Sequence, residues 1–265
     1  LIRKVEEMQY DVIRLNGMVL SYSQYGERDK RLVLLTAERG KITAFVHGVR
    51  RQNSQLQAAT RPFAMGIFEL RPSGGAYTLQ NAEIKNYFDE FGRNMEAVSY
   101  GYYFLELAAY YSRENMDGRD LLNLLYVSLK ALLRDEIPNP LVRMIYEVRA
   151  MTIAGEFPDV FHCSMCGKEL SGRATFAAGR GQLFCEECKK LGESGKQRQV
   201  PGGYSLGNAA LYALQYMVGA PLNRLYTFIL KEEAFEELRR VLHVYKAVYL
   251  DKTFASLEVL KTILA

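Results

Sequence analysis

Four cysteines, arranged as two C-x₂-C pairs, constrain the fold of this chain more than any other feature of its sequence. They are Cys163, Cys166, Cys185 and Cys188, and the chain contains no other cysteine. Tetrahedral zinc takes four thiolates at about 2.3 Å, and each short pair can offer two sulfurs from one tight turn. Residues 167–184 lie between the pairs, a length that lets the chain fold back on itself as a short hairpin. The spacing therefore predicts one structural zinc ion bound by all four cysteines.

Other roles for these cysteines fit the sequence less well. Two disulfides are typical of secreted proteins, but we find no apolar secretory segment. A redox C-x-x-C motif needs no second copy, and the H-x-E and P-C-x-x-C fragments of zinc deaminases are absent from the sequence. His162 could replace one ligand, but four thiolates already complete the coordination sphere. Because a closed sphere has no position for water or substrate, we expect the zinc to be structural.

The N-terminal third of the sequence alternates polar and apolar residues in short runs, with polar or glycine-containing turns between them. Five runs are predicted to be strands, at residues 17–23, 31–36, 41–46, 63–70 and 77–84. Five short antiparallel strands in about 75 residues predict a small barrel of the OB type. Strand count alone also permits an SH3-like barrel.

Positive charge is concentrated in this predicted barrel, at the strand ends and in the loop after the third strand. The whole chain has a formal net charge of only +4, so affinity for a polyanion has to come from such clustering. Basic loops on an OB barrel form a groove for a phosphate backbone. Aromatic rings that could stack on bases occur at Tyr22, Tyr25, Phe45 and Phe63, although Phe45 and Phe63 are more readily explained as barrel filling. We therefore expect the barrel to bind nucleic acid.

Beyond residue 86 the apolar period becomes that of a helix. Helices are predicted near residues 100–111, 121–132, 138–155, 206–218, 231–250 and 256–264. Ser205 is predicted to cap the fourth helix, and residues 221–230 are ambiguous between strand and loop. We interpret the helical stripes as core and assign no site to them. The predicted fold is α+β, with a barrel domain at 1–86, a helical domain at 87–156 and 200–265, and a zinc ribbon inserted at 157–199.

We find no catalytic constellation in the sequence. The chain has three histidines and lacks the G-x-S-x-G, H-E-x-x-H and P-loop motifs. Adjacent carboxylates do not form a metal-binding nuclease cluster. No apolar run approaches the ~18 residues of a membrane span. We expect a binding protein of the cytoplasm with no enzymatic activity and no membrane contact.

The predicted barrel contains several short motifs: Gly17-Met18-Val19-Leu20, Tyr25-Gly26-Glu27-Arg28-Asp29-Lys30, Leu34-Leu35-Thr36, Gly40-Lys41-Ile42 and Gly48-Val49-Arg50-Arg51. These motifs resemble those of the bacterial RecO family of DNA repair and recombination proteins. Pro62-Phe63, a series of helices and the two cysteine pairs follow in the family's order. The resemblance extends from about residue 15 to the end of the chain. Because some members lack the cysteines, the four present here place the chain with the zinc-bearing members.

The resemblance implies an OB-fold, a helical domain and an inserted zinc ribbon. It also implies binding of single- and double-stranded DNA, annealing of complementary strands and, with the partner RecR, loading of RecA onto DNA coated by single-strand-binding protein (SSB). The C-terminal tail of SSB would bind the helical domain, at residues that the sequence does not identify. By their position in the motifs, the expected DNA-binding residues are Arg28, Lys30, Arg31, Lys41, Arg50 and Arg51. Gly48 would form the turn that presents the last two arginines.

Two other interpretations belong to different functional classes. One is an adaptor that mainly binds proteins through its tyrosine-rich helical part (Tyr110, Tyr111, Tyr245 and Tyr249). DNA binding by the isolated residues 1–86 would favour the DNA-binding protein over this adaptor. The other is a zinc hydrolase, which requires an exchangeable water on the metal. Four sulfurs and no oxygen around the metal would exclude the hydrolase.

Overall fold

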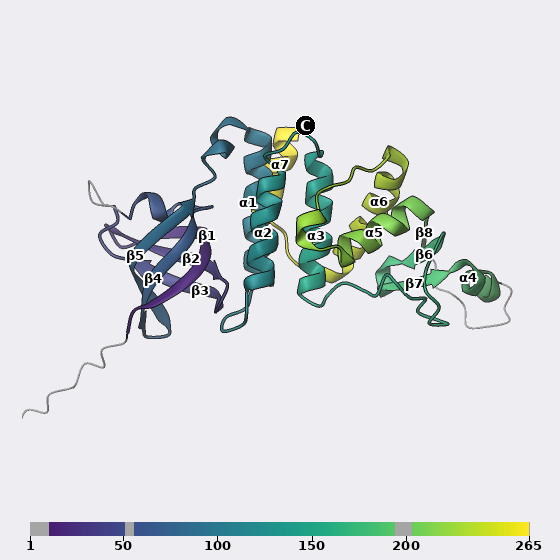
Figure 1. Ribbon diagram of the computed structural model, residues 1–265, viewed down its shortest axis with the longest axis horizontal. Helices are drawn as coiled ribbons and strands as arrows, with labels where there is room; N and C mark the ends of the chain where they lie inside the picture. The colour runs from purple at the N-terminus through teal and green to yellow at the C-terminus, as the bar shows by residue number, and fades with distance from the viewer. Residues whose placement is uncertain (1–10, 51–55, 194–202, 265) are drawn as a thin grey trace, which may run out of the picture. The chain divides into compact units, whose positions relative to one another are not determined.

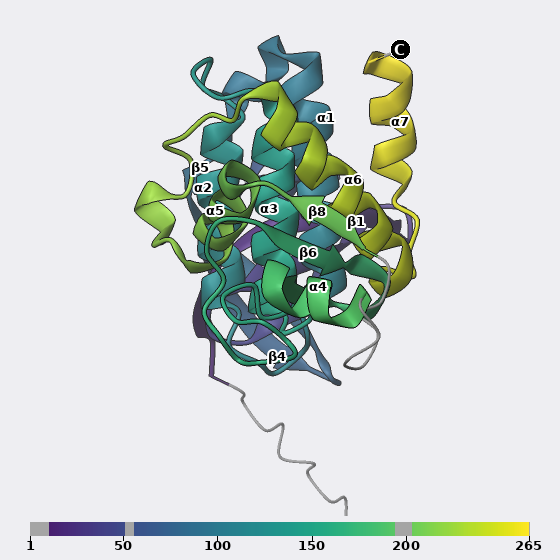
Figure 2. The ribbon, with the colours of Figure 1, turned by 90° about the vertical axis from the view of Figure 1, so that its right-hand side faces the viewer.

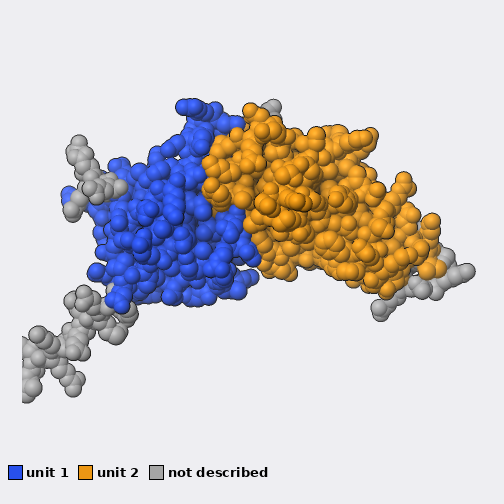
Figure 3. Space-filling view, viewed as in Figure 1, with its two compact units in different colours: residues 1–94, 105–123 blue, residues 95–104, 124–265 orange. Residues whose placement is uncertain are grey.

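The computed structural model describes residues 11–50, 56–193 and 203–264 of the chain (Figure 1). The chain divides into two compact units, unit 1 with residues 1–94 and 105–123 and unit 2 with residues 95–104 and 124–265 (Figure 3). Helices α1 (Met95–Tyr111) and α2 (Arg119–Ala131) each contribute residues to both units. The three-part division expected from the sequence stays a prediction.

Five strands form a closed barrel in unit 1 (Figure 1). They are β1 (Ile13–Tyr25), β2 (Asp29–Thr36), β3 (Gly40–Val46), β4 (Met65–Ser73) and β5 (Ala76–Asn86). Their order around the barrel is β1-β2-β3-β5-β4, which confirms the predicted OB-type barrel.

The prediction that all the strands are antiparallel is wrong for one pair. Strands β3 and β5 run parallel, with Ala44 opposite Tyr77 and Phe45 opposite Thr78. An odd number of strands cannot alternate direction all the way around a closed barrel. One neighbouring pair must therefore be parallel, and in this chain it is β3 with β5.

The barrel interior is filled by alternate residues of its strands. In β2, Leu32 and Leu34 are fully buried, whereas Arg31 is exposed. Burial of each large side chain stabilises the fold by about 1.5–3 kcal/mol relative to exposure. Phe63 is buried as expected, and Phe45 is half-buried on β3.

Unit 2 is mainly helical, and the predicted helices are present (Figures 1 and 2). Besides parts of α1 and α2 it contains α3 (Asn139–Ile153), α5 (Asn208–Gly219), α6 (Glu232–Tyr249) and α7 (Ala255–Leu264). Aromatic residues form much of its core: the rings of Phe104 and Tyr146 stack at 4.1 Å, and Tyr103 is fully buried. Residues 221–230, ambiguous in the sequence, contain a short 3₁₀ turn, Leu222–Arg224, and no strand.

A small three-stranded sheet follows the helical core of unit 2. Strands β6 (Ala174–Ala177) and β7 (Gln182–Cys185) form the hairpin predicted between the cysteine pairs, and α4 (Glu186–Glu193) follows. The third strand, β8 (Tyr204–Leu206), pairs with β6 (Figure 2). It was not predicted, because it begins after the predicted end of the ribbon.

Ser205 is a residue of β8 opposite Thr175, so the prediction that it caps a helix is wrong. The N-cap of α5 is Gly207. Its backbone N–H donates to the carboxylate of Glu237 at 2.7 Å, and this bond anchors the start of α5 to α6. The helix therefore starts two residues later than a serine cap would allow.

Candidate nucleic-acid interface and metal centre

The basic end of the barrel is formed by the β1–β2 hairpin and by the turn after β3. Strand β1 has a bulge between Val19 and Ser21 and then pairs with β2 as far as Tyr25 opposite Asp29. Residues 21–28 are all exposed. The hairpin therefore continues beyond the buried part of the barrel and offers both of its faces to solvent.

Lys30 is the central cation of this region. Its ammonium donates to the hydroxyl of Thr60 at 3.0 Å and lies 4.3 Å from the centre of the Tyr22 ring. Partial burial lowers the pKa of Lys30, and the guanidinium groups of Arg50 and Arg61 lower it further. The mutual repulsion of three cations indicates a positive potential on this side of the hairpin.

The carboxylate of Asp29 holds the turn after β3. It accepts the backbone N–H of Gly48 at 2.8 Å and contacts Nδ1 of His47 at 2.7 Å. Gly48 has a φ of 65°, a left-handed conformation that favours glycine. The chain then reaches Arg50, whose backbone N–H donates to the Arg28 carbonyl at 3.1 Å. The turn thereby brings Arg50 next to the tip of the β1–β2 hairpin.

The structure brings together four of the six residues predicted to bind DNA. Arg28, Lys30, Arg31 and Arg50 lie on the hairpin or against its tip. Lys41 lies apart from them, because its ammonium donates to the carbonyl of Ala109 at 2.9 Å. Arg51 is outside the described residues.

Arg61 joins the four clustered cations, although it lies in none of the motifs that carry the resemblance. It lies directly after the 3₁₀ turn Ala58–Thr60, and Thr60 is the residue that bonds to Lys30. Arg61 also contacts the Asp89 carboxylate at 3.7 Å. A sequence reading could note its charge, but not its approach to Lys30 across a separation of about thirty residues.

The four cysteine sulfurs converge on one point. All four Sγ atoms lie within 4.8 Å of one another, and those of Cys166 and Cys185 are 3.9 Å apart. A tetrahedral site with metal–sulfur bonds of about 2.3 Å has an edge of about 3.8 Å, so the cluster has the size and the donor set for one ion. Cys163 and Cys188 are buried, whereas Cys166 is exposed.

Backbone N–H groups favour the thiolate form at Cys163. Burial raises the pKa of this thiol, but hydrogen bonds from the backbone of Cys185, Cys166 and Met165 outweigh the burial and lower it to about 6. Gly167 supplies the left-handed turn of this pair, with a φ of 71°, and its N–H donates to the Cys163 carbonyl at 2.9 Å. A thiolate is the form that binds a metal.

His162 does not join the cysteines. Its Nδ1 lies 2.8 Å from the carboxylate of Asp159, and the described cluster contains cysteines alone. The segments just before and just after the first cysteine pair are tied to α5, because the amide of Gln215 donates to the carbonyls of Val160 and Leu170 at 3.0 Å. The cluster therefore lies in a ribbon that is anchored to the helical core.

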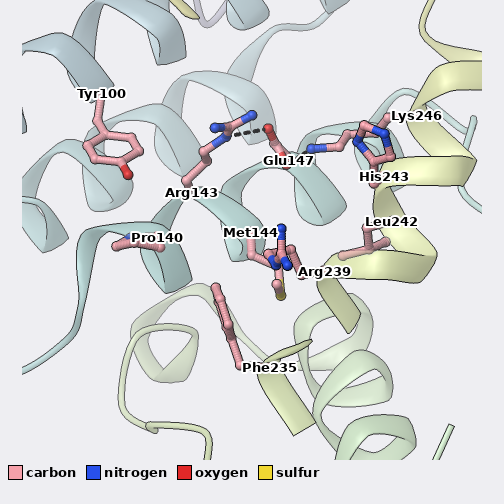
Figure 4. Close-up of a pocket in the computed structure, with 10 residues that line it drawn as sticks. All are labelled: Tyr100, Pro140, Arg143, Met144, Glu147, Phe235, Arg239, Leu242, His243 and Lys246. Carbon is pink, nitrogen blue, oxygen red and sulfur yellow. Dashed lines mark hydrogen bonds and ion pairs between the residues drawn. The ribbon is translucent and has the colours of Figure 1, made fainter. Parts of the chain in front are cut away.

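Unit 2 also contains a pocket of about 240 Å³ between α3 and α6 (Figure 4). Its apolar lining includes Met144, Phe235 and Leu242. Its polar lining includes one buried carboxylate and several basic side chains: Glu147, Arg143, Arg239, His243 and Lys246.

Glu147 is the most strongly held group in this pocket. Its carboxylate accepts from Arg143 Nε at 2.8 Å, and Lys246 forms an ion pair with its other oxygen (Figure 4). The Tyr103 hydroxyl also donates to this carboxylate, at 2.7 Å. Burial alone would raise the pKa of Glu147, but the ammonium of Lys246 and the guanidinium of Arg143 outweigh the burial and lower it to about 2. Two partly exposed cations share one buried anion, so the pocket keeps an excess of positive charge.

We assigned no site to these helices from the sequence. The sequence feature that could have indicated this pocket was the charged pair Arg143 and Glu147, four residues apart in a largely apolar helix. None of the helices in the described part of the chain is both long and apolar enough to cross a membrane.

Comparisons with known proteins identify similar sequences along nearly the whole chain. The family described as "Recombination protein O N terminal" matches residues 8–88, and "Recombination protein O C terminal" matches residues 92–258. A DNA repair protein RecO from Alkaliphilus metalliredigens is 29% identical over 253 residues, which cover 95% of this chain and 100% of the relative. The protein of the same name from Bacillus subtilis is 28% identical over 236 residues, 89% of each chain. That of an Anaeromyxobacter species is 32% identical over 181 residues, 67% of this chain and 71% of the relative.

Proposed function

The chain belongs to the RecO family of non-catalytic DNA repair and recombination proteins, and on that basis we propose that it binds single- and double-stranded DNA and anneals complementary strands. With RecR it would help to load RecA onto single-stranded DNA coated by SSB, in the bacterial cytoplasm. The observation that carries the DNA-binding part is the convergence of Arg28, Lys30, Arg31 and Arg50 at one end of the barrel.

Annealing follows from the chemistry of these cations. Guanidinium and ammonium groups neutralise phosphates and release the counterions condensed on the strands. Two strands held in a positive field repel each other less, so their complementary bases can meet. Contacts to the backbone carry no sequence information, which a general annealing protein requires.

The test replaces Arg50 with alanine and follows DNA binding as a function of salt concentration. Each lost phosphate contact should reduce the slope of log affinity against log salt by about 0.7 to 0.9. Arg239→Ala is the matched control, because Arg239 is an exposed arginine in unit 2, paired with Glu236 at 2.6 Å. An unchanged slope in the Arg50 variant would show that this end of the barrel does not bind DNA phosphates.

We further propose that the four cysteines hold one structural zinc ion. Cys163 and Cys166 would supply two thiolates from one turn, and Cys185 and Cys188 two more from the end of β7 and the first turn of α4. When bound, zinc supplies a crosslink between the two ends of the ribbon and no open coordination position.

The pocket between α3 and α6 favours a second role, as an adaptor for the acidic C-terminal tail of SSB. Its basic side chains would pair with the acidic residues of the tail, and Met144, Phe235 and Leu242 would contact its apolar side chains. This proposal gives the helical unit a protein partner and leaves the barrel to DNA.

Charge reversal at the pocket rim tests this assignment. Arg239→Glu should weaken binding of a synthetic SSB tail peptide, measured by fluorescence anisotropy, and leave DNA binding unchanged. Arg50→Ala should weaken DNA binding and leave binding of the tail peptide unchanged, so each variant is a control for the other. Peptide binding that is unaffected by Arg239→Glu would argue against this pocket.

A further inference from the structure

The exposed end of the β1–β2 hairpin has two faces that differ in what they contact. Residues directly opposite each other in an antiparallel pair point to the same side of the sheet. Tyr22 is opposite Leu32, which is fully buried in the barrel, so Tyr22 lies on the barrel side of the hairpin. Ser23 is opposite Arg31, and Tyr25 lies two residues further along the same face, so Tyr25 lies on the outer side.

The barrel-side face combines an open aromatic ring with several cations. The Tyr22 ring is 47% exposed, and the Lys30 ammonium lies 4.3 Å from its centre. Arg50 and Arg61 are close enough to lower the pKa of Lys30. A DNA strand on this face could stack one base on the Tyr22 ring and place the adjacent phosphates next to the cations.

The outer face also has an open aromatic ring, with one cation, Arg31, and with the carboxylate of Asp29 opposite Tyr25. The Tyr25 ring is 52% exposed and contacts the Phe45 ring, with 4.8 Å between ring centres. Arg31 is opposite Phe45 in the β2–β3 register and is exposed. Arg31 forms no ion pair among the residues that the structure describes, so its charge is available to a phosphate.

We propose that the hairpin end binds one unpaired DNA strand on each face, with a base stacked on Tyr22 on the barrel side and on Tyr25 on the outer side. The inference rests on the proposed DNA-binding function and specifies how one barrel holds both strands for annealing. Stacking on aromatic rings tolerates any base, and it requires bases that are not already stacked in a duplex. The two tyrosines therefore make the hairpin end selective for single strands.

The chain contains no tryptophan, which permits a clean fluorescence experiment. Tyr22→Trp and Tyr25→Trp each introduce one reporter that keeps an aromatic ring on its face. A thymidine tetranucleotide has about the smallest site size of an OB fold and cannot pair with itself. We expect it to quench both reporters and to saturate at two strands per protomer in native mass spectrometry.

Tyr212→Trp is the matched control, because Tyr212 is 68% exposed in unit 2 and lies outside both proposed DNA sites. Its fluorescence should not change. Quenching of this control to the same extent as the hairpin reporters would overturn the assignment of stacking to the hairpin.

Alanine variants test whether the two faces act separately. Tyr22→Ala and Tyr25→Ala should each weaken binding of one of the two strands by about five- to 140-fold, the effect expected for loss of one base–aromatic stack. Each single variant should retain one tetranucleotide per protomer and lose most of its annealing rate. The double variant should retain only the salt-dependent phosphate binding.

The outcomes separate this inference from the proposed function. If the protein binds and anneals DNA but saturates at one tetranucleotide per protomer, the two-face inference is wrong and the DNA-binding function stands. If only one reporter is quenched, a single face binds DNA and the inference is again wrong. If Arg50→Ala leaves the salt dependence unchanged and neither reporter is quenched, both the two-face inference and the proposed DNA-binding function of the barrel end are wrong.

Discussion

Lys41 donates its ammonium group to the carbonyl oxygen of Ala109, 2.9 Å away, in the last turn of α1. The last four carbonyls of a helix have no partner within the helix, so this contact satisfies one of them. The backbone N–H of Lys41 also donates to the Arg113 carbonyl at 3.1 Å. The start of β3 and the end of α1 are therefore joined within unit 1.

This contact predicts that Lys41 matters for stability and not for DNA binding. Lys41→Met should lower the free energy of unfolding by about 1–2 kcal/mol, because a charge-assisted hydrogen bond is lost and the carbonyl of Ala109 loses a partner. Urea unfolding measures this change. The salt dependence of DNA binding should match that of the unchanged protein. If the slope of log affinity against log salt decreased as expected for Arg50→Ala, Lys41 would be a DNA-binding residue after all.

Lys41 illustrates which part of the site the sequence cannot determine. Lys41 and Arg31 are both cations in short, alternating strands, and both lie in or beside the motifs of the family. The partner of Lys41 is distant in sequence and becomes a neighbour only when the barrel meets the end of α1. Composition and spacing predict a basic barrel, whereas the assignment of each cation to structure or to function depends on contacts across the fold.

The predictable features follow from local rules. Strand alternation identifies the five barrel strands, and the C-x₂-C spacing predicts the converging sulfurs. Strand β8 was missed because it pairs with β6 from well outside the ribbon. Glu147 was missed because its three partners, Tyr103, Arg143 and Lys246, come from three different helices.

Metal removal should act on the ribbon before it acts on DNA binding. Cys185→Ser, or treatment with a strong chelator, removes the crosslink between the two cysteine pairs, so the thermal unfolding midpoint should fall. DNA binding should persist, because Lys30 and Arg50 belong to unit 1 and the cysteines to unit 2. Thermal unfolding followed by circular dichroism, with DNA titrations at the same temperature, measures both. Unchanged thermal stability with loss of DNA binding would contradict this order.

Asp29 should limit the DNA affinity of the barrel end while it holds the turn that carries Gly48. Asp29→Asn keeps an oxygen that can accept the Gly48 N–H and removes one negative charge beside Lys30. We expect DNA binding to become tighter, by a few-fold at low salt, because less repulsion opposes the phosphates. Fluorescence anisotropy at two salt concentrations measures the change. Weaker binding at both concentrations would show that the charge of Asp29 is required to hold the turn.

The buried carboxylate of Glu147 couples the stability of unit 2 to pH. Its pKa is lowered to about 2, whereas an unfolded chain has the ordinary value near 4.5. A carboxyl group whose pKa is lower in the folded state stabilises the fold at pH values above the unfolded pKa. This stabilisation decreases as the pH falls below about 5 and is lost below about 2. It amounts to about 3 kcal/mol at neutral pH.

Glu147→Gln should therefore destabilise the protein by about 3 kcal/mol at pH 7, because Lys246 and Arg143 lose the charge that compensates their burial. The difference from the unchanged protein should shrink steadily between pH 5 and pH 3, since the carboxyl group is then protonated in the unfolded chain while Glu147 in the folded protein stays mostly ionised. Urea unfolding of both proteins at pH 7, 5 and 3 measures it. Glu258→Gln, which removes an exposed partner of Lys261, is the control and should show little change at any pH. A Glu147→Gln effect that is equally large at pH 7 and pH 3 would show that the glutamine fits the pocket poorly, and that the charge of Glu147 is not what stabilises unit 2.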